Sequence, residues 1–311
     1  MLDRPRGGIN LFWYFLLLVF GVFCCATAVI FIKLADIQPI TLSAFRLLAA
    51  SIFLFPVFLR DYRLHKEQVT RKTLLAPVWP AVMLSIHFIS WLTAARLTPA
   101  ANASLIVNLV PLVMPVLLYI FLRERISGIE AVATMLALAG VGVLGVSDYN
   151  INPEFLYGDI LCFISMIFYS IYLVLSRKNA ELESFWLYIV PLYFTAFVFC
   201  FLTALLFEDP FRYYETKDLL LGLGLGLVPT VIGHTVMNFA MQRLRGQVVS
   251  IFTMFQFVFA GIMSYFIFNE IPSRTFYFVS LLLTLSGIMV ACDTTKQASL
   301  FRGDNCKERS G

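Results

Sequence analysis

Residues 11–32 of the chain read LFWYFLLLVFGVFCCATAVIFI, an apolar run without a charged side chain. A helix rises about 1.5 Å per residue, so this run is long enough to cross a hydrocarbon core of about 30 Å. It follows Arg4 and Arg6 and ends at Lys33, with no small-residue cleavage site after a short apolar core. We therefore expect a retained first membrane span and not a cleaved signal peptide.

The composition of the whole chain has the same character. Hydrophobic residues make up 60% of the 311 residues and charged residues 14%, and the mean hydropathy is +0.84. A soluble domain carries about a quarter charged residues. Period-2 alternation is absent, and lipid requires a backbone whose polar groups are satisfied within the segment. The composition therefore predicts an all-α integral membrane protein, embedded in the bilayer, and argues against a soluble enzyme or a nucleic-acid-binding protein.

Ten apolar runs are long enough to span a membrane, and most of the connections between them are short. They cover residues 11–33, 40–59, 76–97, 100–122, 127–147, 155–176, 185–207, 218–241, 247–269 and 275–293. These connections leave no room for a folded domain outside the membrane.

Lysine and arginine are unevenly distributed between the two sides of this arrangement. With the N-terminus in the cytoplasm, 17 of the 23 Lys and Arg residues fall in cytoplasmic segments, 5 fall outside, and Arg46 lies inside a span. Because positive charge accumulates in cytoplasmic loops, this distribution predicts that both termini are cytoplasmic.

The two halves of the chain resemble each other weakly. A shift of 147 positions pairs His87 with His234, and a shift of 146 pairs Glu124 with Glu270. Five spans per half is an odd number, so the second half is expected to be inverted, as in many secondary transporters. The expected organisation is a cytoplasmic tail over 1–10, five-helix repeats over 11–147 and 155–293, and a disordered cytoplasmic tail over 294–311.

The first half carries several recognisable motifs: RLTPAANASLI at 96–106, the following Pro111, LRER at 122–125, ALAGVG at 137–142, and the entry into the second run at 39–46. Together they resemble the EamA-type family of the drug/metabolite transporter superfamily. The second copy departs from the pattern, with Phe257 where proline is expected and Asn269 where the family often has glycine. The resemblance implies ten helices, an inner (plasma) membrane location and export or uptake of small metabolites. It implies no particular substrate.

Two histidines lie inside apolar runs, where a polar side chain is costly unless it faces a cavity or a partner. His87 shares a helix face with Trp91, and His234 shares one with Asn238. We expect these faces to line a central cavity, and the histidines could exchange protons with the solvent. Helix packing, with each imidazole bonded to a backbone carbonyl, is the alternative.

Further candidates for the cavity lie on the fourth, sixth and ninth runs. They are Asn108, Tyr169, Tyr172 and Gln256, and for each of them hydrogen bonding between packed helices is the alternative. Arg46 is the one basic residue deep in a run. It could bind a substrate carboxylate or phosphate, or it could reach the outer interface or a structural partner.

Glu124 and Glu270 each close the fourth apolar run of their half. They are expected to pair with Arg123, Arg125 or Arg274, or to hold a closed gate.

No phosphate-binding loop, nucleophile–base pair or cluster of metal ligands is visible in the sequence, so no enzyme activity, cofactor or metal is expected. The favoured function is a carrier that moves a small amphipathic metabolite, such as an amino acid or a related compound, by alternating access. A proton or another ion is a candidate coupling partner, and a monomer and a homodimer are both compatible with the sequence. An intramembrane lipid-modifying enzyme and a channel are the alternatives.

Overall fold

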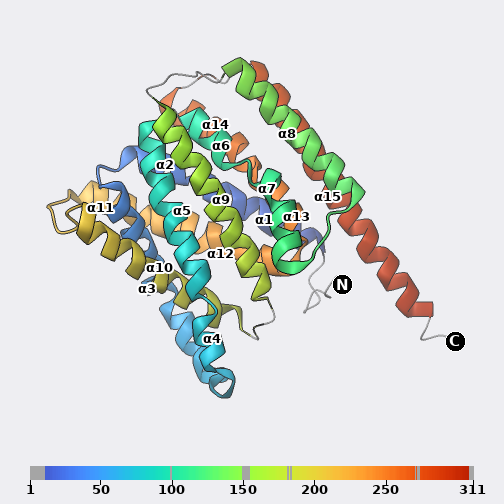
Figure 1. Ribbon diagram of the computed structural model, residues 1–311, viewed down its shortest axis with the longest axis horizontal. Helices are drawn as coiled ribbons and strands as arrows, with labels where there is room; N and C mark the ends of the chain where they lie inside the picture. The colour runs from blue at the N-terminus through green and yellow to red at the C-terminus, as the bar shows by residue number, and fades with distance from the viewer. Residues whose placement is uncertain are drawn as a thin grey trace.

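The computed structural model describes the chain except for residues 1–10, 99, 149–154, 181, 183, 270, 272–273 and 308–311. The described residues form helices joined by short connections and contain no strand, as the composition predicts (Figure 1). The proposed N-terminal tail over 1–10 and the glutamate at 270 lie outside the described residues.

Two sets of helices correspond to the two halves of the chain. The first consists of α1 (Leu11–Ala26), α2 (Ala28–Leu34), α3 (Pro39–Leu64), a 3-10 turn η1 (Lys66–Gln68), α4 (Arg71–Leu75), α5 (Val78–Leu97), α6 (Ala100–Val107), α7 (Val110–Leu122) and α8 (Gly128–Asp148). The second consists of α9 (Leu156–Lys178), α10 (Phe185–Phe207), α11 (Thr216–Leu225), a π-helical segment η3 (Gly226–His234), α12 (Thr235–Arg243), α13 (Gly246–Thr253), α14 (Phe255–Phe268) and α15 (Arg274–Lys307).

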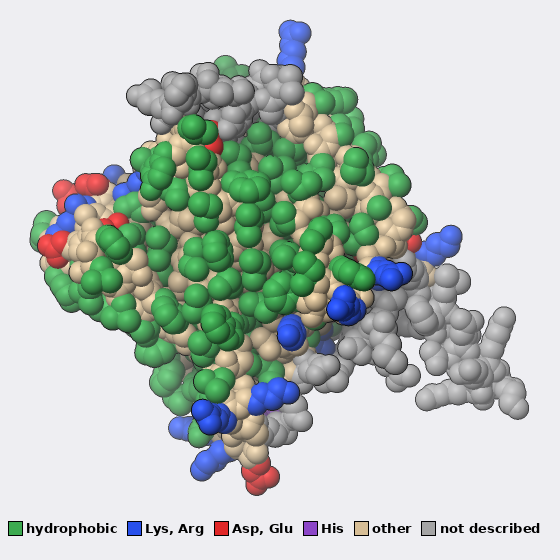
Figure 2. All heavy atoms as spheres, in the orientation of Figure 1, with side chains coloured by type: hydrophobic (Ala, Val, Ile, Leu, Met, Phe, Trp, Pro, Cys, Tyr) green, Lys and Arg blue, Asp and Glu red, His purple; other side chains and the backbone are tan. Residues whose placement is uncertain are grey.

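Nine helical stretches of the described chain are long and apolar enough to cross a membrane. They are Leu11–Leu34, Pro39–Leu64, Arg71–Leu97, Ala103–Leu122, Leu156–Lys178, Phe185–Phe207, Thr216–Arg243, Gly246–Ile267 and Arg274–Lys296. A shorter apolar stretch, Gly128–Val143, lies in α8. Large hydrophobic side chains cover the visible face of the molecule, and the charged side chains on that face gather toward its edges (Figure 2). Such a surface suits contact with lipid.

Two of these stretches, Ala103–Leu122 and Gly246–Ile267, are each broken into two helices. Between α6 and α7, Pro111 cannot donate a backbone hydrogen bond, and the helix restarts at its position. Between α13 and α14 no proline is present. There the hydroxyls of Ser250 and Thr253 donate to the carbonyls three residues earlier, at 2.8 and 2.6 Å. Such bonds compete with the helical pattern, so the second copy breaks at Met254 without a counterpart of Pro111 in the first copy.

Helices from the two halves pack against each other in a reciprocal pattern. In the first half α5 packs on α9, and in the second half η3 and α12 pack on α1. The second helices of the halves, α3 and α10, pack together, and so do the last helices, α8 and α15, which lie side by side (Figure 1). The broken helices cross, with α6 on α14 and α7 on α13. Each of these helix contacts in one half therefore has a counterpart made by the equivalent helices of the other half.

The final helix is longer than the sequence predicts. Residues 294–307, for which disorder is expected, continue α15 without interruption as far as Lys307. No proline interrupts this segment, and adding one residue to an existing helix costs far less than starting a new one.

Candidate functional site

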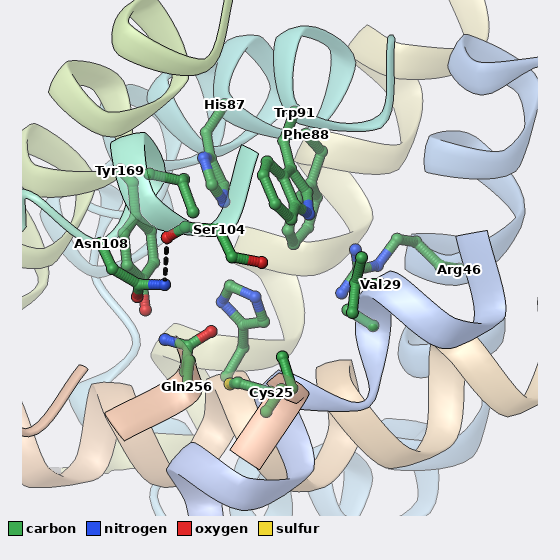
Figure 3. A pocket seen from close by; sticks show the side chains of 15 residues that line it. Cys25, Val29, Arg46, His87, Phe88, Trp91, Ser104, Asn108, Tyr169 and Gln256 are labelled. Carbon is green, nitrogen blue, oxygen red and sulfur yellow. Dashed lines mark hydrogen bonds between the residues drawn. The ribbon is translucent and has the colours of Figure 1, made fainter. Parts of the chain in front are cut away.

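A cavity lies at the centre of the bundle, between the broken helices and the α1–α3–α5 group (Figure 3). The space open to the centres of water molecules is about 40 Å³, enough for a few waters by the usual measure. Seven of the nine predicted cavity residues line it: Arg46, His87, Trp91, Asn108, Tyr169, His234 and Gln256. They come from both halves of the chain.

Arg46, in the second turn of α3, is fully buried. Its Nε donates to Thr230 Oγ1 at 2.9 Å, and its guanidinium carbon lies 3.9 Å from the centre of the Phe88 ring. Within the described residues, neither Nη1 nor Nη2 has a hydrogen-bond partner. The side chain therefore does not reach the outer interface, which was one of its two alternative roles.

The approach of η3 to α3 positions this arginine. A Cβ on Gly226 would lie 2.7 Å from Ala49 Cβ and 3.0 Å from the Arg46 carbonyl, so only glycine allows this contact. Four residues further on, the Thr230 hydroxyl donates to the Leu225 carbonyl at 3.0 Å while it accepts from Arg46. π-helical segments are often found at functional sites, and here the segment carries the residue that orients the guanidinium.

The two histidines lie close together, with ring centres 6.2 Å apart. His87 Nδ1 lies 2.7 Å from Ser165 Oγ and 3.1 Å from the Ser165 carbonyl, and its ring stacks on Tyr169 at 4.6 Å. His234 Nδ1 has no hydrogen-bond partner among the described residues. His87 therefore combines both roles considered for it, because it lines the cavity and also binds a neighbouring helix. His234, in contrast, has an unsatisfied nitrogen beside the cavity.

Asn108 and Gln256 lie beside the breaks of the two crossed helices (Figure 3). Asn108 Nδ2 donates to the Ser104 carbonyl at 2.7 Å, one turn earlier, just before α7 begins. Both amides line the cavity. The crossing thus contributes two amide side chains to the cavity, one from each half.

Tyr172 and Asn238 do not line the cavity, in contrast to the sequence prediction. Their side chains are hydrogen-bonded to each other, and Asn238 Nδ2 also donates to the His234 carbonyl at 2.7 Å. The helical spacing placed them on the correct faces. They lie one turn too far along α9 and α12, where the Asn238 amide donates to the Tyr172 hydroxyl.

Other lining residues were not singled out from the sequence. They include Cys25, Ala28, Val29, Phe88 and Ala260. None is a polar residue of the kind that is costly in lipid.

Polar contacts between the halves close one end of the bundle, which we term the Arg245 end. Arg177 Nε lies 2.7 Å from Glu124, and Arg245 binds the buried Glu130 carboxylate at 2.5 and 2.7 Å. Hydrogen bonding to Glu130 raises the pKa of the Arg245 guanidinium. The partner of Glu124 is therefore not Arg123 or Arg125, its neighbours in sequence, but an arginine from the other half.

The opposite end, termed the Glu208 end, is also closed by contacts between the halves. The Glu208 carboxylate accepts hydrogen bonds from the backbone of Ile40 and Thr41 at the start of α3, at 3.0 and 2.7 Å. Asp218 accepts from the backbone of Asp36 at 2.9 Å. Both carboxylates satisfy amides across the boundary between the halves.

The fold and site define a multi-pass helical membrane protein with a central cavity between two related halves. The chain belongs to the EamA-like transporter family, whose sequence profile matches residues 12–146 and again 156–292. This confirms the resemblance seen in residues 96–125 and 137–142 and places the chain among membrane transporters.

Two further comparisons agree with this assignment. A protein of Archaeoglobus fulgidus, named as an uncharacterized transporter, is 25% identical over 279 residues, which are 88% of this chain and 94% of that protein. A solved crystal structure superimposes with a TM-score of 0.75 at 17% identity, covering 92% of this chain and 99% of its own. At that identity the second comparison supports the fold alone.

Proposed function

We propose that this chain is a secondary transporter, an exporter or permease, that moves a small amphipathic metabolite across the inner (plasma) membrane by alternating access. An amino acid or a related compound is the substrate class that the sequence favours. The observation that carries the proposal is the central cavity, which both halves line and which lies between two ends held by contacts between the halves. Breaking one set of contacts while the other holds would open the cavity to one side at a time.

The proposed topology has ten spans in two inverted repeats, with both termini in the cytoplasm. The apolar part of α8 is taken as the fifth span, alongside the nine longer stretches. The reciprocal packing of the halves supports an inverted repeat, because it is the pattern that a pseudo-twofold axis in the membrane plane produces. The distribution of Lys and Arg then assigns the Arg245 end to the cytoplasm.

A carrier accounts for the site better than an enzyme or a channel does. The described residues contain no cluster of His, Cys, Asp or Glu suited to a metal. Polar side chains lie along the middle of the bundle, where a carrier binds its solute. A lipid-modifying enzyme would instead need them near one membrane interface. A channel would need a continuous polar path, whereas both ends here are closed by paired side chains.

Counterflow in proteoliposomes tests the proposal. A mixed panel of metabolites would be trapped inside, and exchange with external solute would be read by mass spectrometry. The wild type is compared with an Asn108→Ala, His234→Ala variant, and Met135→Leu, on the lipid-facing surface, serves as the control. We expect exchange by the wild type and the control, and its loss in the double variant. No exchange by folded wild-type protein would overturn the transport proposal, and exchange that survives the double variant would overturn the site.

Coupling to protons through His87 and His234 stays a prediction. It is tested in the same vesicles by imposing a pH gradient, which should drive accumulation of the solute if the histidines carry protons. Equal accumulation with and without the gradient would instead favour a facilitator.

A further inference from the structure

Arg46 carries a full positive charge into the centre of the bundle, and no negative charge of the described residues is paired with it. None of the ion pairs of the described chain includes it. Two buried carboxylates of the described chain have partners of their own, with Asp159 accepting from Thr98 at 2.6 Å and Asp218 from the backbone of Asp36 at 2.9 Å. A buried charge is costly unless it is paired, so a missing anion is the simplest explanation of this arrangement.

The guanidinium is held so that only one edge stays free. Thr230 binds Nε, and the Phe88 ring covers one face of the group. The two terminal nitrogens have no partner and belong to a side chain that lines the cavity (Figure 3). Two parallel N–H donors match the two oxygens of a carboxylate, which is the geometry that makes arginine a selective ligand for this group.

The rest of the lining fits an uncharged body. Trp91, Tyr169 and Val29 offer apolar and aromatic surface, and Asn108 and Gln256 offer neutral amides. No carboxylate lines the cavity among the described residues, so an ammonium group would find no counter-charge there. One cation also matches one negative charge better than the two of a phosphate monoester.

We propose that the solute is a monocarboxylate with an apolar or aromatic body, whose carboxylate binds Nη1 and Nη2 of Arg46. The inference rests on the proposed transport function, because it assigns the cavity to the solute. It narrows the class of small amphipathic metabolites and departs from the amino acids that the sequence favours: acids without an ammonium group should bind better than zwitterionic amino acids, and amines should not bind.

Binding is tested on the purified full-length chain in detergent with probes that share one body. The probes are phenylacetate, phenylacetamide, phenethylamine, phenylalanine and phenyl phosphate, and the readout is the shift of the melting temperature together with equilibrium dialysis of labelled phenylacetate. We expect phenylacetate to bind and the amide and amine not to bind. Arg46→Gln should weaken phenylacetate at least tenfold, which corresponds to the loss of charge-assisted hydrogen bonds. Lys33→Gln, which removes an exposed charge, should leave binding unchanged.

Equal binding of the acid and the amide, or unchanged binding of the acid in Arg46→Gln, would overturn the inference, as would the failure of every carboxylate probe. Tighter binding of phenyl phosphate would do so as well and would favour phosphorylated solutes.

Folding of the variant is checked without ligand, where Arg46→Gln should melt no earlier than the wild type, because the substitution removes an unpaired charge. Exchange of a non-carboxylate solute that survives Arg46→Gln would overturn only this inference and would be consistent with the proposed transport function. Binding that depends on Arg46, with no exchange of any solute, would overturn the transport function but would support the carboxylate site.

Discussion

Glu208, at the end of α10, is bonded to Thr41, at the start of α3, through both the backbone nitrogen at 2.7 Å and the hydroxyl at 2.8 Å. Asp61, in the last turn of α3, is in turn bonded to Ser184, the residue that caps α10. Each of these two helices, α3 and α10, thus carries an acidic side chain near its C-terminal end, and this side chain binds the N-terminal end of the other helix. A shift of 147 positions relates Asp61 to Glu208, the same shift that relates His87 to His234.

The capping contact at Glu208 should contribute measurably to stability. Glu208→Ala leaves the first amides of α3 without their acceptor, and loss of a helix cap costs about 1–2 kcal/mol. Thermal unfolding in detergent should therefore begin at a lower temperature. Glu215→Ala is the control, because Glu215 precedes α11, is exposed and forms no side-chain cap. Equal stability of the two variants would contradict a capping role.

The pair of Arg245 and Glu130 should behave as a buried ion pair. Arg245→Ala leaves the buried Glu130 carboxylate without its partner and should lower the free energy of unfolding by about 3 kcal/mol, in the range for breaking such pairs. Glu130→Gln in the Arg245→Ala background should restore part of the loss. Arg243→Ala is the control, because Arg243 lies over the Phe239 ring and forms no ion pair among the described residues. Additive effects of the two substitutions in a double-mutant cycle would argue against the pair.

The same pair has a defined pH response. The folded state raises the pKa of Arg245 above an already basic value, so its stabilising effect is complete at pH values below the unfolded pKa and is lost only as the pH rises through the folded pKa. Both values lie far above neutrality. The stability difference between the wild type and Arg245→Ala should therefore stay constant from pH 7 to pH 9. A difference that shrinks over this interval would assign the effect to another titrating group.

Close packing at Gly226 should be sensitive to a single methyl group. Gly226→Ala places a Cβ 2.7 Å from that of Ala49, and overpacking of this kind costs about 1–3 kcal/mol. The shift of η3 should also reduce solute exchange, because η3 carries Thr230. Gly142→Ala is the matched control, since no atom of another described segment lies within 4 Å of its Cβ position. If both variants unfold and transport like the wild type, the contact between α3 and η3 does not position Arg46.

The aromatic face beneath Arg46 should affect carboxylate binding. Phe88→Leu keeps an apolar side chain of similar bulk but removes the ring on which the guanidinium rests. The loss of a desolvated cation–π contact corresponds to about 2 kcal/mol, so the dissociation constant for phenylacetate should rise about tenfold or more. Phe53→Leu on the lipid-facing side of α3 is the control, with its side chain 60% exposed. Unchanged affinity in Phe88→Leu would mean that Thr230 alone orients the guanidinium.

The sequence predicted much of the cavity because lipid penalises polar groups. His87, His234, Asn108 and Arg46 stood out in apolar runs for that reason, and the structure brings all four to one cavity. Apolar lining residues such as Phe88 give no such signal, because the same side chain would be equally stable facing lipid. The partner of Glu124 could not be predicted either, since Arg177 lies 53 positions away.

Composition and periodicity were enough to establish a helical membrane protein with two related halves, because the bilayer imposes its requirement on each span separately. Which helix faces which depends on close packing between segments that lie far apart in the sequence, and only the tertiary structure contains that information. The η3–α3 contact at Gly226, the reciprocal caps at Asp61 and Glu208, and the unpaired edge of Arg46 all arise there. A single sequence shows which polar groups are costly to bury. It does not show which neighbouring residue compensates for that free-energy cost.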